Sequence, residues 1–317
     1  MRVTMRDVAA RAGVSLKTVS RVVNREPHIR PETQEAVNAA IGDLGWTPNS
    51  SARSLRTGRT GVIGIVVTEL RRPLLAALVE TLVTEVNARG LNAAVEPVHD
   101  DADRLAQVWS QRGDTFDALL AVDLPHLPEV GPDGGPVVRV DVTQASATDG
   151  CDRVSTDLAQ AADLIERHLS VMGRSHPVQV GAGPLTGRTA APVVELGDDV
   201  GRTAGYRAAQ RAVVANPGVD ALVCCTDEVA LGALAGLHAA GLTVPDQVAV
   251  IGFGALDDGW FATPSLTTID PEPRALARSA VDLLARRLSG EVAGGPEEVR
   301  VPVTLIRRES TLGAGAR

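Results

Sequence analysis

The chain has 317 residues, of which 44% are hydrophobic and only 2% aromatic, so we expect about two globular domains with aliphatic cores. Its net charge of −8 is unevenly distributed. Residues 1–60 contain ten Lys and Arg against five Asp and Glu, a net charge of +5, and the remainder contains 21 against 34, a net charge of −13. A basic segment on an acidic body is typical of a protein that contacts phosphate with one end.

Composition also excludes several classes of protein. Cys151, Cys224 and Cys225 suggest neither a disulfide framework nor a metal site, and we expect reduced, mostly buried thiols. The N-terminus lacks a hydrophobic export signal, and no apolar run is long enough to span a membrane. These features predict a cytoplasmic protein without a membrane partner. No motif predicts a metal, a cofactor or an enzymatic activity.

Residues 5–24, MRDVAARAGVSLKTVSRVVN, predict two short helices joined by a tight turn. Their apolar faces consist of Val8, Ala9 and Ala12 in the first helix and Val19, Val22 and Val23 in the second. Gly13 is suited to end the first helix, and Ser15 can cap the second. The surface left on the second helix consists of Leu16, Lys17, Thr18, Ser20, Arg21 and Asn24. This cationic surface has the size of a DNA major groove.

The spacing A-x-x-A-G-V-S-x-x-T-V-S-R-V-V-N resembles the head of the LacI/GalR family of bacterial transcription regulators. The resemblance implies that Leu16, Lys17 and Arg21 face base edges. Residues expected to hold phosphates or neighbouring bases are Thr18, Ser20 and Asn24, and the expected DNA-binding set also includes Ser15 and His28. A third helix, opened by Pro31 and ended by Gly45, completes a helix-turn-helix DNA-binding domain at residues 1–48.

Residues 49–60 are predicted to form a hinge helix and linker. A helix of about two turns begins at Asn49 and contains Ala52, Arg53, Leu55 and Arg56. Because isolated helices need about 12–15 residues to be stable in water, this one should order only against a partner. In the resembled family the hinge helices fold in pairs over the DNA minor groove, where Leu55 would be the wedge and the arginines would contact phosphate. The alternative is a flexible basic linker.

From Gly61 onward, strand-like and helix-like segments alternate in two series. The predicted strands are Val62–Val67, Leu91–Val95, Ala118–Val122, Val137–Val140, Val178–Val180, Ala221–Cys224 and Val248–Gly252. The predicted helices are Leu74–Asn87, Ala102–Gln111, Leu158–Met172, Arg202–Val214 and Glu228–Ala240. Such alternation predicts parallel sheets wrapped by helices in two lobes.

This order resembles the periplasmic-binding-protein-like core of the same family, with Pro273–Ser289 and Val299–Ile306 crossing back between the lobes. The expected fold is an all-α helix-turn-helix DNA-binding head with a hinge helix, joined to a two-lobed α/β core with parallel sheets. The core, residues 61–317, would bind an effector and dimerise.

The expected ligand cleft departs from that of sugar-responsive relatives. Gly254 and Ala255 stand where an aspartate pair is usual, and Leu185–Val193 is too short for the usual Arg-x-x-Gly helix, which leaves Arg188 as its only candidate. Aromatic stacking faces are scarce, so a conventional sugar pocket is disfavoured. The polar groups expected near the cleft are Arg72, Asp123, Asp157, Arg188, Thr226 and Asp227.

The resulting prediction is a homodimeric, sequence-specific DNA-binding transcription regulator, a repressor, that binds a pseudo-palindromic operator. A small-molecule effector of unknown identity would act in the interlobe cleft. One alternative is a regulator with a degenerate sensor domain, controlled by a protein partner or by nothing. A second alternative, a solute-binding module, should have an export signal and no basic head.

Overall fold

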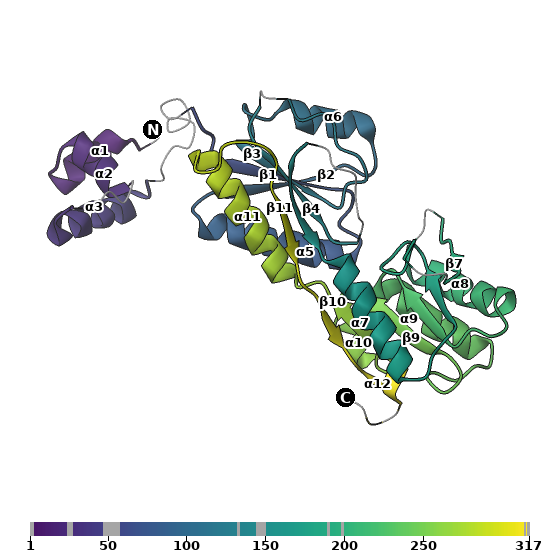
Figure 1. Ribbon diagram of the computed structural model, residues 1–317. Coiled ribbons are helices and arrows are strands. Elements are labelled where there is room, and N and C mark those ends of the chain that lie inside the picture. The colour runs from purple at the N-terminus through teal and green to yellow at the C-terminus, as the bar shows by residue number, and fades with distance from the viewer. Residues whose placement is uncertain are drawn as a thin grey trace. The chain divides into compact units, whose positions relative to one another are not determined.

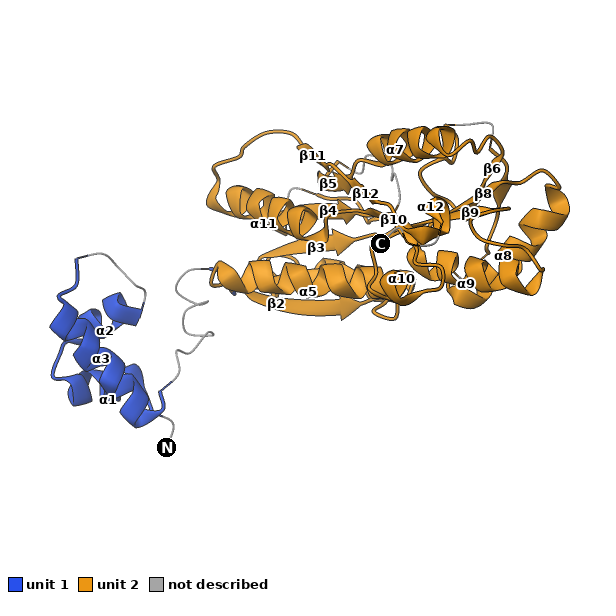
Figure 2. Cartoon of the chain, turned by 90° about the horizontal axis from the view of Figure 1, so that it is seen from below, with its two compact units in different colours: residues 1–60 blue, residues 61–317 orange. Residues whose placement is uncertain are grey.

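The computed structural model describes residues 3–23, 28–46, 58–131, 134–143, 150–188, 191–197, 200–313 and 315. The chain forms two compact units, residues 1–60 and residues 61–317 (Figure 2). The predicted boundary at residue 48 and the predicted hinge helix fall in residues 47–57, outside the described residues. Both therefore stay predictions.

The first unit contains three described helices, α1 (Met5–Ala12), α2 (Leu16–Val23) and α3 (Pro31–Leu44). Gly13 and Gly45, with φ of 67° and 57°, end α1 and α3 in the left-handed conformation that the sequence predicts for these glycines. The helices enclose a small apolar core formed by Val8, Ala9, Val19, Val22, Val37, Ala40 and Trp46. This core turns the polar surface of α2 outward.

The second unit contains two six-stranded sheets (Figure 1). The first sheet has the order β11-β5-β4-β3-β1-β2 and is parallel throughout. Its strands are β1 (Val62–Val67), β2 (Asn92–Pro97), β3 (Ala118–Val122), β4 (Val137–Asp141), β5 (Asp152–Thr156) and β11 (Glu298–Val301). The second sheet has the order β12-β10-β9-β8-β6-β7, and only its β10–β12 pair is antiparallel. Its strands are β6 (Pro177–Val180), β7 (Val193–Val194), β8 (Ala221–Cys224), β9 (Ala249–Phe253), β10 (Thr267–Asp270) and β12 (Thr304–Ile306).

Helices cover both faces of each sheet, which is why the central strands read as continuous apolar runs. The helices are α5 (Pro73–Ala88), α6 (Ala102–Ser110), α7 (Leu158–Val171), α8 (Arg202–Ala215), α9 (Asp227–Ala239), α10 (Asp258–Phe261), α11 (Pro273–Ser289) and α12 (Glu309–Leu312). In the first lobe α5 and α11 pack on one face and α6 on the other (Figure 1). In the second lobe α8 and α9 share an apolar cluster with β6, β8 and β9. The predicted fold class, a helical head and a core of two α/β lobes with parallel sheets, is confirmed.

The chain crosses between the lobes three times. It leaves the first sheet after β5 and enters the second through α7, returns between β10 and α11, and crosses again between β11 and β12. The predicted crossing at Val299–Ile306 is confirmed, since this range spans the ends of β11 and β12. The predicted crossing at Pro273–Ser289 is refined: α11 lies wholly against the first lobe, and the crossing precedes it. The sequence analysis missed β5 and β10, which are rich in polar residues, and β7, which has only two residues.

Candidate functional site

The second helix of the head exposes the surface that the sequence analysis predicts. Leu16 is 45% exposed and Lys17 is exposed, whereas Val19 and Val22 are buried. Lys17 and Arg21 lie one turn apart and therefore on the same side of α2. Two basic side chains at this spacing can reach adjacent base edges or phosphates in a major groove.

Hydroxyl groups fix the beginning of this helix. The backbone N–H of Thr18 donates to Ser15 Oγ at 3.1 Å, as expected for an N-cap, and Ser15 Oγ lies 2.8 Å from Thr18 Oγ1. Helix N-termini with unpaired N–H groups and a positive dipole end attract phosphate. The predicted residues Ser15 and Thr18 therefore form one unit at the end of α2 that is suited to a backbone phosphate.

Polar contacts link α1 to α3 and cap the N-terminus of α1. Arg11 of α1 forms a salt bridge of 2.6 Å with Asp43 of α3, and both side chains are more than half exposed. Asp7 accepts hydrogen bonds from the N–H and the hydroxyl of Thr4, and the side-chain bond to Thr4 lowers the pKa of Asp7. Such exposed pairs contribute little to stability, so the apolar core carries the fold of the head.

The remaining predicted DNA contacts are only partly placed. Ser20 and Arg21 lie on α2, half-buried, and His28 is exposed with a φ of 65°. Six further residues lie outside the described residues: Asn24, Asn49, Ala52, Arg53, Leu55 and Arg56. The minor-groove role of Leu55 stays a prediction.

A cavity of about 760 Å³ lies between the two lobes of the second unit. The first lobe contributes Arg72 and Thr143, which follow β1 and β4. The remaining lining residues are Leu158, Ala159, Gly181, Ala182, Gly183, Pro184, Thr186, Arg188, Glu195, Leu196, Gly197, Val200, Cys225 and Thr226. The volume is in the range of pockets that bind small molecules.

Three of the six predicted cleft residues line this cavity: Arg72, Arg188 and Thr226. Thr226 caps α9 by accepting the N–H of Val229 at 3.3 Å. Arg188 forms a salt bridge of 2.5 Å with Asp163. Arg72 is the residue before Pro73, which begins α5.

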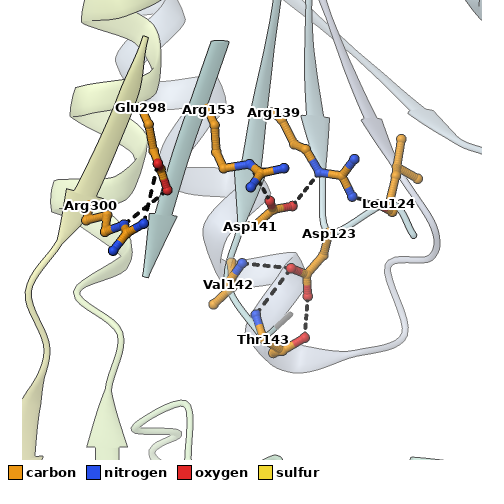
Figure 3. A network of polar contacts seen from close by, with 9 residues as sticks. All are labelled: Asp123, Leu124, Arg139, Asp141, Val142, Thr143, Arg153, Glu298 and Arg300. Carbon is orange, nitrogen blue, oxygen red and sulfur yellow. Dashed lines mark hydrogen bonds and ion pairs between the residues drawn. The ribbon is translucent and has the colours of Figure 1, made fainter. Parts of the chain in front are cut away.

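Asp123 and Asp157, which the sequence analysis predicts near the cleft, do not line this cavity, and both carboxylates accept hydrogen bonds from backbone N–H groups. Asp123 is 3% exposed and accepts hydrogen bonds from the N–H groups of Val142 and Thr143 and from the Thr143 hydroxyl (Figure 3). Asp157 caps α7 by accepting the N–H of Gln160 at 2.9 Å. Each acid therefore positions a neighbour of the cavity, Thr143 or the start of α7, without lining it.

Asp227, the third acid predicted near the cleft, is completely buried and does not line the cavity. Its carboxylate accepts the Thr268 hydroxyl at 2.5 Å and the N–H of Leu256 at 2.7 Å. Burial raises the pKa of Asp227 to about 6, against the lowering effect of these two bonds. Its role is to join the start of α9 to β10 and to the segment after β9.

A polar network in the first lobe lies beside Asp123 (Figure 3). Arg139, fully buried, forms a salt bridge of 2.8 Å with Asp141, which lies 3.3 Å from Arg153. Desolvation raises the pKa of Asp141, and Arg139 opposes that shift. These charges occupy β4 and β5, whereas the neighbouring strands β3 and β1 present apolar side chains to α6.

The sequence analysis missed Thr143 and Cys225 as lining residues. Both follow the carboxyl ends of parallel strands, where open α/β sheets bind ligands, and this rule could have identified them. Burial raises the pKa of the Cys225 thiol to about 11, so the group stays protonated near neutral pH. None of the three cysteines forms a disulfide, and Cys224 and Cys225 are buried while Cys151 is half-buried, as predicted.

The fold and these two sites define a class of protein: a transcription regulator with a helix-turn-helix head and a two-lobed core of the ligand-binding type. Residues 4–49 match the family described as bacterial regulatory proteins, lacI family, and residues 156–311 match a periplasmic binding protein-like domain. The chain is 30% identical over 337 residues to the HTH-type transcriptional repressor PurR of Erwinia tasmaniensis, an alignment that covers 97% of this chain and 96% of that protein. The chain belongs to the lacI family.

Two further comparisons agree. PurR of Haemophilus influenzae is 29% identical over 341 residues, with 97% of this chain and 98% of that protein covered. The fold is similar to that of the lac repressor dimer bound to operator and the anti-inducer ONPF, with a TM-score of 0.78, 23% identity and coverage of 98% and 100%. The chain is thus a DNA-binding transcription repressor and not an enzyme. Among the described residues, no helix has the length and apolar character needed to cross a bilayer.

Proposed function

We propose that two copies of this chain bind a pseudo-palindromic operator, with α2 of each copy in the major groove of one half-site. A two-fold dimer presents two identical recognition helices, so the operator should repeat its sequence with the same symmetry. The lac repressor structure of similar fold is a dimer bound to operator. The observation that carries the proposal is the basic side of α2, on which the exposed Lys17 and the half-buried Arg21 lie one turn apart.

Arg21 is the residue that we propose for a guanine contact. An arginine that bonds two acceptors of a guanine contributes about 1–3 kcal/mol of discrimination against other bases. Arg21→Ala should therefore weaken binding to the preferred operator by about tenfold or more and relax the preference at one base pair. Fluorescence anisotropy on a site selected from random DNA, and on its single-base variants, measures both effects.

Arg11→Ala is the matched control. Arg11 has the same charge as Arg21 but lies on α1, where it forms a salt bridge with Asp43 of α3. Arg11→Ala should leave the base preference unchanged. Equal weakening by Arg21→Ala on every DNA sequence would assign Arg21 to a phosphate instead. Absence of any selectable operator for the wild-type protein would contradict the proposed function itself.

We also propose that the interlobe cavity binds a small effector that favours one arrangement of the lobes. A ligand shifts such an equilibrium only if it binds the two arrangements with different affinity, and a ligand in this cavity would contact residues of both lobes, whose spacing differs between the arrangements. Adding the low-molecular-weight fraction of a cell extract to the protein–operator complex should change the anisotropy. No change with several extracts would favour the alternative, a core controlled by a protein partner or by nothing.

A further inference from the structure

We infer that the interlobe cavity binds a small organic anion, and that Arg72 binds the carboxylate or phosphate group of this ligand. The inference rests on the proposed effector role of the cavity and specifies the chemistry of its ligand. It starts from the charges that line the cavity. Among the described lining residues these are Arg72, Arg188 and Glu195.

The two arginines differ in their surroundings. Arg188 is exposed and neutralised by Asp163 at 2.5 Å. Arg72 is half-buried, and its Nε is enclosed without a hydrogen-bond partner. No described carboxylate lies within the 4.0 Å of a salt bridge to Arg72, although its charge acts on Glu228 and Cys225 at longer range. A guanidinium offers five donors in a planar fork, and an enclosed donor without a partner costs free energy.

The hydroxyl groups of the cavity also favour an acceptor-rich ligand. Thr226 Oγ1 accepts the N–H of Val229, and Thr186 Oγ1 accepts the N–H of Gly183 at 3.0 Å. Because each oxygen already accepts a backbone N–H, the hydroxyl hydrogen is left to donate. Arg72 and these two threonines therefore provide donors from both lobes.

Two helix N-termini also border the cavity. Leu158 and Ala159, the first residues of the 14-residue helix α7, line the cavity, as does Thr226, the cap of the 13-residue helix α9. The partial positive charge of these ends is already met by Asp157, which caps α7, and by Asp227 and Glu228 in the first turn of α9. The preference for an anion therefore rests on Arg72. Glu195 is the single acid among the described lining residues, and it is exposed.

The same lining disfavours a neutral saccharide. The described lining residues include no aromatic ring on which a sugar could stack, and the acidic predictions Asp123, Asp157 and Asp227 are engaged elsewhere. A charge-assisted bidentate bond from an arginine to a carboxylate or phosphate is stronger than a bond between neutral groups. A single anionic group can therefore provide the anchor that stacking and acids provide for a sugar.

Isothermal titration calorimetry on the full-length protein tests this inference with ligands that differ in one group. Glucose 6-phosphate and glucose differ only in the phosphate, citrate supplies carboxylates, and inorganic phosphate supplies the anion alone. We expect binding of glucose 6-phosphate, citrate or both, and none of glucose. Preference between the first two assigns the anionic group as phosphate or carboxylate.

Arg72→Gln should weaken binding of the anion at least tenfold. Arg71→Gln is the matched control, because the neighbouring arginine is 88% exposed, forms a salt bridge with Glu69 and does not line the cavity. The affinity of the Arg71→Gln variant for the anion should stay within twofold of wild type. That result would show that the loss in Arg72→Gln does not come from the change in net charge alone. An unchanged thermal unfolding midpoint verifies that Arg72→Gln folds.

Three results would overturn the inference: no anion bound by the wild-type protein, equal binding of glucose, or unchanged anion affinity in Arg72→Gln. Since calorimetry involves no DNA, it is independent of operator binding. Anion binding without any change in operator affinity would retain the anion site and reject the effector role. If the wild-type protein bound an anion but no operator, the proposed operator binding would be rejected and the anion site would be retained.

Discussion

Asp227 ties three segments of the second lobe together through two hydrogen bonds made by a single buried carboxylate. One oxygen accepts the Thr268 hydroxyl of β10 and the other the N–H of Leu256, after β9. The site is tight, since a Cβ on Gly252 would lie 2.1 Å from Asp227 Oδ1. A polar group in such a place contributes because its partners would otherwise be buried without bonds.

Removal of this carboxylate should therefore destabilise the second lobe. We expect Asp227→Ala to lower the free energy of unfolding by about 1–3 kcal/mol, because it leaves the Leu256 N–H and the Thr268 hydroxyl without their acceptor. Asp227→Asn should retain most of the stability, since an amide oxygen can accept the N–H and Thr268 can accept from the amide. Urea unfolding of both variants measures the difference, and equal loss in the two would show that the charge itself is required.

The raised pKa of Asp227 also predicts a pH dependence. The group binds its proton up to about pH 6 in the folded protein but only up to about 3.8 when unfolded, so the folded state holds more protons between these values. The contribution of Asp227 to stability is thus greatest below about pH 4 and declines as the pH rises through 6. Relative to Asp227→Asn, wild-type stability should fall over this range. A constant difference between the two proteins would contradict the raised pKa.

At the scale of elements, glycines allow α8 and α9 to pack with their backbones close together. A Cβ added to Gly205 of α8 would lie 2.1 Å from the carbonyl oxygen of Val229, and one added to Gly232 of α9 would lie 1.9 Å from that of Arg202. Neither glycine has a positive φ, so both serve the helix contact and not the local backbone. Their spacing sets the distance between the two helices.

Gly232→Ala should destabilise the core although alanine is the better helix former. Alanine gains about 1 kcal/mol of helix propensity, but relief of a clash with backbone requires that the helices move apart, which costs about 1–3 kcal/mol or more. Denaturant unfolding should show a net loss. Gly42→Ala in α3 is the control, because its Cβ would meet nothing within 4 Å, and it should stabilise the head or leave it unchanged.

At the scale of the whole molecule, the second lobe exposes large aromatic side chains that would be buried if this face contacted another protein. Phe261 and Trp260 of α10 are 81% and 46% exposed, and Tyr206 of α8 is 36% exposed. A salt bridge of 2.9 Å between Arg202 and Asp258 links these two helices. Clustered exposed aromatic residues are typical of protein interfaces. We propose that this face contacts the second copy of the chain in the operator-binding dimer.

Phe261→Glu should therefore shift the protein toward monomers and weaken operator binding, because two linked heads bind more tightly than one. Sedimentation equilibrium measures the association, and anisotropy measures operator affinity. Val171→Glu, at a side chain of α7 that is 79% exposed on the same lobe, should leave the dimer intact. A dimer of unchanged stability in Phe261→Glu would place the interface elsewhere.

Local patterns in the sequence determined the head and the order of the core. Apolar spacing with Gly13 and Gly45 predicted α1, α2 and α3, and apolar runs predicted the long strands and helices to within a few residues, because these signals act between near neighbours along the chain. The strands β5 (DRVST) and β10 (TTID) were missed because their polar residues interrupt any apolar run, and β7 was missed because it has only two residues.

The polar groups of the cavity depended on the tertiary structure. Asp123, Asp157 and Asp227 follow strands of the two sheets just as Arg72 and Thr226 do, so their positions along the chain do not separate ligand contacts from structural acids. Their roles depend on which backbone N–H groups the fold brings close to them. Each of the three acids accepts a hydrogen bond from a backbone N–H, whereas the Nε of Arg72 has no hydrogen-bond partner. That difference arises from packing between distant segments, which a sequence of residue types does not specify.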